Sequence, residues 1–228
     1  MKKKQHKRSV FWLFTFALTA AFFWSGCVII SNLGTPTRHE RKIAAEYDLA
    51  GHTDQKMLVF VNQPAWLNAQ DNLRYYLMKK INENFIKKAE IPPEYLVGYN
   101  ELSEFRSNHA DFSLLSPTEV GAALNADMVL LVMVNGYELN KMAQTNYYTG
   151  FLSVRIVLHD VATGEKLWPE SARSKSIKVG FEVESRGREV ALARLVSALA
   201  HCTVRYFYNC PQAKFKIADD LTEIDWER

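Results

Sequence analysis

Few residues in this chain have the types and spacings that carry out catalysis. His159 and Asp160 adjoin each other in an expected strand, so their side chains point to opposite faces of a sheet and cannot act as a dyad. The carboxylates that a cleft would have to bring together are spread along the chain, at Glu101, Glu104, Asp127 and Asp160. The sequence has no nucleophile elbow, no glycine-rich phosphate loop and no HExxH pair. We therefore expect a protein that is not an enzyme.

Two cysteines near the C-terminus offer redox chemistry instead. If one straight helix held both Cys202 and Cys210, their separation along the axis would be about 12 Å, beyond the reach of a disulfide. A helix that ends near Tyr208, with the chain folding back, would allow the bond; a buried Cys202 beside an incidental Cys210 is the other interpretation. Neither cysteine has a histidine or an acid at zinc-ligand spacing, so we expect no metal and no cofactor.

The N-terminus carries the pattern of an export signal. Five Lys and Arg residues within 1–8 precede the apolar run 10–24, and a Ser-Gly pair separates this run from Cys27. A cysteine directly after small residues resembles the lipobox of bacterial lipoproteins, although Trp24 stands where lipoboxes usually have Leu. The resemblance implies that Cys27 is acylated, with palmitate, and becomes the first mature residue. Because apolar residues continue to Ile30, an uncleaved anchor of about twenty residues is the alternative.

The charge balance argues against nucleic acid as a partner. The chain has 28 Lys plus Arg and 25 Asp plus Glu. Residues 1–26 hold five of the positive charges and no acid, which leaves 23 against 25, a net charge of −2, in the remainder. The basic character therefore belongs to the signal, and a positive footprint for nucleic acid is missing.

The stretch 127–168 is the clearest part of the fold. Met128 to Val134 are apolar without a break, which predicts a strand buried on both faces. From 152 to 158 apolar and polar residues alternate, so the next strand should have one buried face and should lie antiparallel to the first. Asp160, Thr163 and Gly164 then predict a turn.

The order of elements predicts a single α/β domain. Expected strands are 57–61, 95–99, 128–134, 152–158 and 177–183; expected helices cover about 73–87, 101–107, 116–125 and 187–206. The β α β α β β β α order gives a mixed sheet of about five strands, with an antiparallel meander over 127–184 and helices packed on the sheet. The expected divisions of the chain are 1–26 as signal peptide, 27–55 as lipid-anchored tether, 56–210 as α/β domain and 211–228 as polar C-terminal tail.

Residues 45–208 resemble a group of envelope lipoproteins. The resemblance rests on AEYDL before LVFV, on Ala126 and Asp127 before the central strand, and on the turn from Asp160 to Trp168. These features are similar to lipoproteins related to the curli-secretion lipoprotein, the penicillin-binding-protein activator lipoprotein and the N-terminal domain of TolB. AEYDL before LVFV is most similar to planctomycete lipoproteins. The resemblance implies a protein that acts by binding and assembly.

The expected function follows from the anchor and the missing catalytic set. We expect a lipoprotein of the cell envelope that faces the periplasm, at the outer rather than the inner membrane, held by its lipid or by an uncleaved helix. It would bind envelope proteins in envelope assembly or maintenance; the alternative is an accessory or solute-binding lipoprotein of a transport system. Tyr147 and Tyr148, in a polar loop over 141–150, are the candidate partner contacts, and cross-strand packing is their ordinary alternative.

Overall fold

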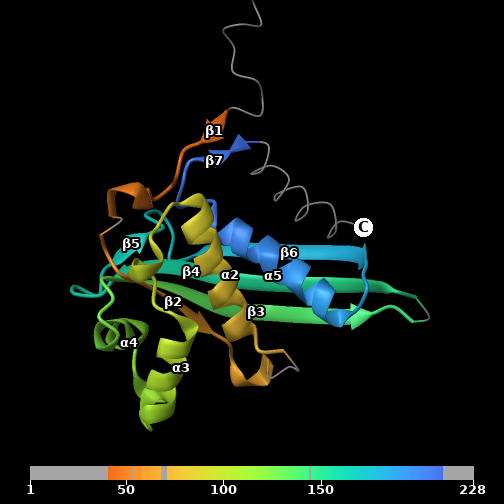
Figure 1. Cartoon of the computed structure of the whole chain (residues 1–228), viewed down its shortest axis with the longest axis horizontal. Helices are drawn as coiled ribbons and strands as arrows, with labels where there is room; N and C mark the ends of the chain where they lie inside the picture. Colours follow the sequence, from red (N-terminus) through yellow and green to blue (C-terminus); the bar gives the residue numbers. More distant parts are fainter. Residues whose placement is uncertain (1–40, 53, 68–70, 144, 213–228) are drawn as a thin grey trace, which may run out of the picture. The chain divides into compact units, whose positions relative to one another are not determined.

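The computed structural model describes residues 41–52, 54–67, 71–143 and 145–212 (Figure 1). Within them, five strands form one mixed sheet, four α-helices accompany it, and two short strands form a separate antiparallel pair. The predicted α/β class and the sheet of about five strands are confirmed. The signal peptide, Cys27 and the tail from 213 lie outside the described residues.

Two long strands dominate the sheet. β3 (Met128–Lys141) lies between β2 (Met57–Asn62), to which it is parallel, and β4 (Tyr147–Asp160), to which it is antiparallel. β4 in turn pairs with β6 (Lys175–Glu184) along most of its length and with β5 (Lys166–Trp168) at its end. The predicted antiparallel meander is therefore confirmed.

One face of the sheet is covered by two helices. α2 (Leu73–Lys88) lies against β2, and α5 (Arg188–Val204) lies beside α2 and against β4 and β6 (Figure 1). The apolar stripe of α2 is wholly buried, with 0% exposure at Leu73, Leu77, Ile81 and Phe85. An apolar residue at every fourth position keeps one side of the helix on the sheet, as the pattern predicts.

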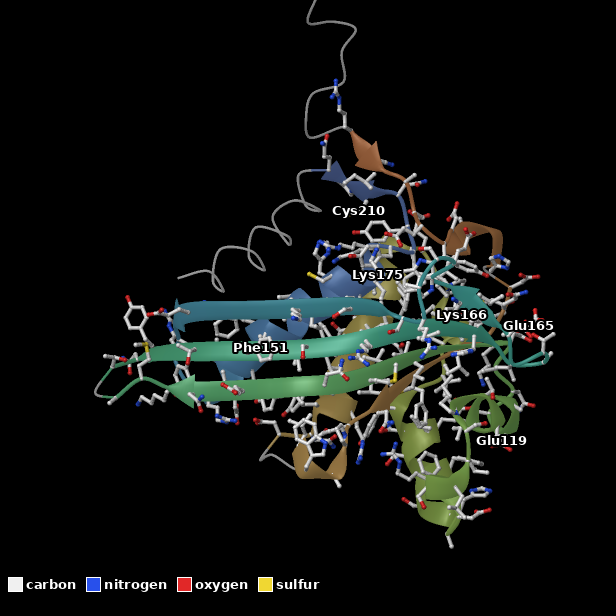
Figure 2. All side chains as sticks on the ribbon, turned by 180° about the vertical axis from the view of Figure 1, so that it is seen from behind. Glu119, Phe151, Glu165, Lys166, Lys175 and Cys210 are labelled. Atoms are coloured by element: carbon white, nitrogen blue, oxygen red, sulfur yellow. The ribbon has the colours of Figure 1, made fainter. Side chains whose placement is uncertain are left out.

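The opposite face is covered only along the first half of β3. α4 (Pro117–Ala123) packs there because Gly121 has no side chain: a Cβ at this position would lie 2.5 Å from Cγ2 of Val129. Met128 to Val134 are accordingly buried or half-buried without a break, as the apolar run predicts. In the second half of β3 only Tyr137 and Leu139 are buried. Figure 2 shows this barer half of the sheet facing the viewer, with α2 and α5 behind it.

A β-bulge at Asn135 changes which residues of β3 face the helices. Val134 pairs with Val154 but Gly136 pairs with Ser153, so one extra residue is inserted in β3. Without the bulge, Tyr137 would lie on the barer face of the sheet, where Gly136 and Ser153 now lie, and would point away from α2 and α5. With it, Tyr137 lies on the helix-covered face.

α4 begins and ends as its sequence predicts. The N–H of Glu119 donates to Ser116 Oγ at 3.2 Å, and Glu119 Oε2 accepts from the Ser116 N–H at 2.6 Å, which completes the capping box. Asn125 then adopts a φ of 53°, the left-handed conformation in which asparagine often follows a helix.

The strand predicted over Tyr95–Tyr99 is wrong. Residues Pro93–Tyr95 form a turn of 3₁₀ helix, and α3 begins at Tyr99 and runs to Asn108. Only Leu96 bridges to Met57, while the Val97 carbonyl accepts from the Asn82 side chain at 3.0 Å. Between a proline pair and Gly98, which caps α3, too few residues remain to extend a ladder.

The residues before β2 pack on the domain from Lys42 onward. β1 (Lys42–Ile43) pairs with β7 (Cys210–Pro211), and Leu49 is 1% exposed. Glu46 forms an ion pair with Lys175 at 2.7 Å and accepts from Trp168 Nε1 at 3.2 Å. The range predicted as tether, 27–55, thus includes a segment that belongs to the packed domain.

None of the helices in the described residues is both long and apolar enough to cross a membrane.

Val132→Asp should cost several kcal/mol of the free energy of unfolding, because Val132 is 0% exposed and the carboxylate would have no partner in the core. Arg155→Ala should cost less than about 1 kcal/mol, since Arg155 lies exposed on the barer face. Urea unfolding followed by circular dichroism measures both. Equal losses in the two variants would contradict the assignment of the faces.

Candidate interaction surface

His159 and Asp160 have structural roles rather than a shared one. Asp160 Oδ1 accepts from the N–H of Thr163 at 2.7 Å and from its Oγ1 at 2.8 Å, and these bonds lower the pKa of the Asp160 carboxyl. Gly164, with a φ of 71°, donates its N–H to the Asp160 carbonyl at 3.0 Å. The predicted turn is confirmed. His159 is half-buried, and its Nδ1 has no partner in the described part of the chain.

Two of the other carboxylates meet at Lys56 rather than in a cleft. The Lys56 N–H donates to Asp127 Oδ2 at 2.7 Å, and Lys56 Nζ donates to Glu101 Oε1 at 3.1 Å and to the Leu124 carbonyl at 3.0 Å. Glu104 lies exposed on α3. These bonds hold the start of β2 to the start of β3 and to α3.

The two cysteines and His201 have separate contacts in the described part of the chain. Cys202 and Cys210 are both buried, and the hydroxyl of Tyr208 donates to Cys210 Sγ at 3.3 Å. The disulfide between them stays a prediction. His201 Nδ1 accepts from Lys88 Nζ at 2.8 Å. Across the residues that the structure describes, no three His, Cys, Asp or Glu side chains are grouped as metal ligands.

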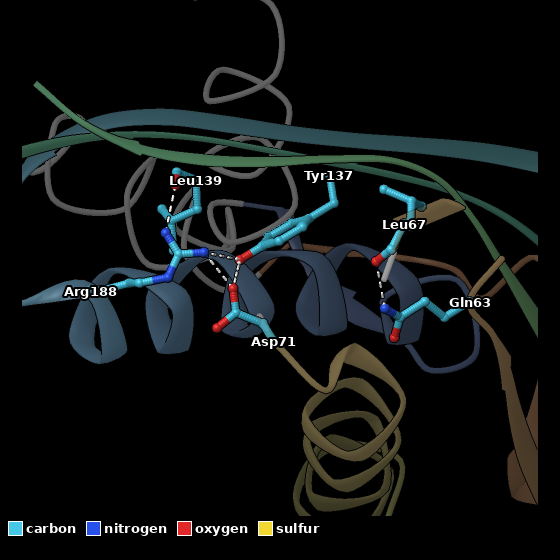
Figure 3. A network of polar contacts seen from close by, with 6 residues as sticks. All are labelled: Gln63, Leu67, Asp71, Tyr137, Leu139 and Arg188. Carbon is cyan, nitrogen blue, oxygen red and sulfur yellow. Dashed lines mark hydrogen bonds and ion pairs between the residues drawn. The ribbon is translucent and has the colours of Figure 1, made fainter. Parts of the chain in front are cut away.

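A partly buried polar network joins both helices to the far half of β3 (Figure 3). Asp71 Oδ2, just before α2, accepts from the Tyr137 hydroxyl at 2.5 Å and from Arg188 Nη2 at 2.5 Å. Arg188, the first residue of α5, also donates from Nη1 to the Leu139 carbonyl at 2.6 Å. Burial raises the pKa of the Tyr137 hydroxyl, and its bond to Asp71 raises that pKa further. One carboxylate therefore fixes the N-termini of α2 and α5 to the sheet.

The sequence interpretation missed this network, although one signal pointed to it. Asn135-Gly136 follows an unbroken apolar run, and a glycine inside a strand often marks a bulge. Only the bulge turns Tyr137 toward the helices. The contributions of Asp71 and Arg188 had no local signal, because the two residues are far apart in the chain.

The structure separates the two tyrosines predicted as partner contacts. Tyr148 is 8% exposed and belongs to the core, which is the packing alternative, so it cannot present a surface. Tyr147 is 43% exposed. Neighbouring residues of a strand point to opposite sides, and here one side is core and the other solvent.

Tyr147 belongs to a surface at the end of the β3–β4 hairpin. The turn is held by the Met142 N–H, which donates to the Tyr147 carbonyl at 3.0 Å, and by Ser185, whose N–H donates to the Asn146 carbonyl at 2.9 Å. The second bond joins the turn to the loop before α5. A hollow open to solvent lies at this junction, lined by Asn146, Ser185, Arg186, Val190 and Arg194.

We call this region the hairpin surface, defined by Met142, Asn146, Tyr147, Arg186, Val190 and Arg194. Met142 and Val190 are 41% and 42% exposed, so both present apolar area to solvent. Tyrosine, methionine and arginine are the residue types enriched at protein interfaces. The arrangement offers aromatic and apolar area beside two guanidinium groups.

Comparisons with known proteins give only distant structural similarities. No family model matches the chain, and no curated protein matches it in sequence. Similar solved structures include lipoprotein GNA1162 from Neisseria meningitidis, with 18% identity and a TM-score of 0.42 over 64% of this chain and 94% of that one. A PelC dodecamer from Paraburkholderia phytofirmans matches with 15% identity and a TM-score of 0.36, over 74% and 94%. The LpoB C-terminal domain from Salmonella enterica matches with 16% identity and a TM-score of 0.32, over 63% and 86%. These similarities are too low to carry a function to this chain.

Tyr137→Phe should lower the free energy of unfolding by about 1 to 2 kcal/mol, because Asp71 loses one of its two donors in a partly buried site. Urea unfolding at neutral pH measures the loss. Tyr75→Phe is the matched control: its hydroxyl accepts from exposed Lys79, and its loss should cost less than about 0.5 kcal/mol.

The same variant should change the pH dependence of stability. The pKa of Tyr137 in the folded protein is raised above its unfolded value of about 10. The neutral hydroxyl therefore makes its full contribution to the free energy of unfolding below about pH 10, and this contribution is lost as the pH rises from there through the folded pKa. Tyr137→Phe should therefore lose less stability than the wild type between about pH 9 and 11. If the free energy of unfolding fell equally with pH in the two proteins, the pKa of Tyr137 would not differ between the folded and unfolded states.

Proposed function

We propose that the protein is a non-catalytic lipoprotein of the cell envelope, facing the periplasm, that binds partner proteins through the hairpin surface. The observation that carries the proposal is the exposure of Tyr147, 43%, beside Met142 at the end of a long hairpin. The role would lie in assembly or maintenance of the envelope.

The place of the hairpin surface in the fold supports this function. β3 and β4 have 14 residues each, or about 46 Å at the usual rise of a strand. The chain enters the domain at Lys42, near the opposite end of β4, where Trp168 pairs with Leu158 and bonds to Glu46. A partner that contacts the hairpin would therefore meet the end of the domain opposite to the one where β4 pairs with β5.

The span from a lipidated Cys27 to β1 leaves room for such a partner. Fully extended, the residues between Cys27 and Lys42 would reach at most about 50 Å. An anchor of this reach would hold the domain near a membrane and leave the hairpin accessible. The outer membrane is the proposed location.

The hydrogen bonds of the carboxylate side chains support a binding role over catalysis. Asp160 is held in a turn, and Glu101 and Asp127 are held by Lys56. Asp71 is held by Tyr137 and Arg188. A general acid or base needs a carboxyl in reach of a substrate, and these carboxyls are occupied by the fold.

The second function class, solute binding, has less support in the described residues. The hollow at Phe151, between Glu138 and Glu182, has a volume of about 190 Å³ and opens to solvent. The hollow at the hairpin surface is also open, and Val190 is its one apolar side chain among the described lining residues. Solute sites usually enclose most of the ligand in an apolar pocket.

Tyr147→Ser should abolish specific crosslinks to partner proteins while the melting temperature stays nearly unchanged, because the side chain is exposed and the turn bonds use only its backbone. In vivo crosslinking followed by mass spectrometry, with melting of the purified variant, tests both parts.

Tyr148→Ser is the matched control for the neighbouring position. It should cost about 3 kcal/mol of stability, since it removes a buried aromatic ring. The hairpin surface would lose its proposed role if Tyr147→Ser kept every crosslinked partner while remaining folded.

Cys27→Ser should leave an unprocessed precursor without acyl mass, because the thiol of Cys27 is the group that would be acylated. Intact-mass spectrometry of membrane fractions measures processing and lipid together. A mature, non-acylated chain in normal yield from this variant would contradict lipidation, and a retained signal in the wild type would favour the uncleaved anchor.

A further inference from the structure

Two arginines in the described part of the chain, one on α2 and one on α3, have no carboxylate partner there. Arg74 lies in the first turn of α2, and Arg106 lies near the end of α3. Both are half-buried, and in the described part of the chain neither forms an ion pair. The charges of both guanidinium groups are therefore left uncompensated by the fold.

The two side chains are held in place by groups that carry no charge. Arg74 Nη2 donates to the Gln63 carbonyl at 2.9 Å. The guanidinium of Arg106 lies over the ring of Phe112, 4.7 Å from its centre, and Phe112 itself stacks on Phe60 of β2. Burial lowers the pKa of the Arg106 guanidinium, and the nearby charge of Arg74 lowers it further. The fold thus keeps two like charges close together at some cost in stability.

The most exposed large apolar side chains lie in the turns that hold these arginines. Leu114, 84% exposed, is in the same 3₁₀ turn as Phe112 (Phe112–Leu114). Trp66, 72% exposed, is in the turn Ala65–Leu67, which Gln63 fixes by donating from Nε2 to the Leu67 carbonyl at 2.9 Å (Figure 3). Both turns are ordered by side-chain contacts, yet each presents an apolar residue to solvent.

We call the group of Trp66, Arg74, Arg106, Phe112 and Leu114 the arginine-pair surface, because contacts of Gln63 and Phe112 link the two turns to the two arginines. We propose that it binds an acidic segment of a partner protein, with carboxylates seated on Arg74 and Arg106 and apolar side chains of the segment on Trp66 and Leu114. Guanidinium groups often pair with carboxylates in a bidentate geometry, and tryptophan and arginine are both enriched in interface hot spots. A carboxylate between the two arginines would also relieve their repulsion.

A peptide fits this surface better than an anionic membrane does. A membrane presents a broad negative plane, and two exposed carboxylates lie beside the arginine-pair surface: Glu104 on α3 with Arg106, and Asp111 directly before the Phe112–Leu114 turn. These carboxylates would be driven against the lipid headgroups. A narrow acidic segment can contact the arginines and avoid the neighbouring acids.

Peptide selection on the full-length protein in detergent tests the inference. A library of short random peptides is selected on the wild type, and the enriched peptides are synthesised and titrated by fluorescence anisotropy. We expect enrichment of Asp and Glu together with Leu or aromatic residues. The dissociation constant should rise at least about ten-fold in Arg74→Gln/Arg106→Gln.

Two further variants keep the experiment specific. Lys79→Gln/Lys87→Gln removes the same charge from exposed positions of α2 and should change the dissociation constant less than about two-fold. Tyr147→Ser should bind the peptides like the wild type, so this result is separable from that at the hairpin surface. Arg106→Gln alone, which breaks no hydrogen bond of the described structure, should keep the melting temperature and still weaken binding.

Three outcomes would overturn the inference. The first is enrichment of peptides without carboxylates, or no enrichment at all. The second is equal binding of the enriched peptides by the wild type and by folded arginine variants. The third is arginine-dependent binding to vesicles of phosphatidylcholine and phosphatidylglycerol in equal parts with no peptide binding, which would assign the surface to a membrane.

Discussion

A mismatch in length between the strands and the helices shapes this domain. A strand of 14 residues extends about 46 Å, whereas a helix of 17 residues, the length of α5, extends about 25 Å. The helices therefore cannot cover the whole β3–β4 hairpin on both faces. Burial on both faces is confined to the first half of β3, where α4 adds a second layer through Gly121. The far half needs another means of support.

That support is polar and depends on one inserted residue. The bulge at Asn135 turns Tyr137 toward the helices, where its hydroxyl and Arg188 share the carboxylate of Asp71. This charge-assisted network, on the helix-covered face, adds stability to a half of the sheet that has no helix on its other face. The network also orients α5 from its first residue, and so fixes the loop that borders the hairpin surface.

The parts of the fold that the sequence predicted are those with local causes. The apolar run from Met128, the capping box at Ser116 and the turn at Asp160 each depend on neighbouring residues, and each is present. The strand expected at Tyr95–Tyr99 failed because apolar content alone does not supply a pairing partner. The sites were harder to predict from the sequence, because their residues come together only when separate helices pack. This holds for Asp71 with Arg188 and for Arg74 with Arg106.

Strand register connects the stability of the domain to the surface that it presents. Side chains alternate along β4, so a slip of one residue relative to β3 would bury Tyr147 and expose Tyr148. The bulge opposes such a slip, because it fixes the pairing of β3 with β4 on both of its sides, Val134 with Val154 and Gly136 with Ser153. The bulge that turns Tyr137 toward the helices thus also helps to decide which tyrosine of β4 faces solvent. A surface at the end of an incompletely covered hairpin can keep a defined composition for this reason alone.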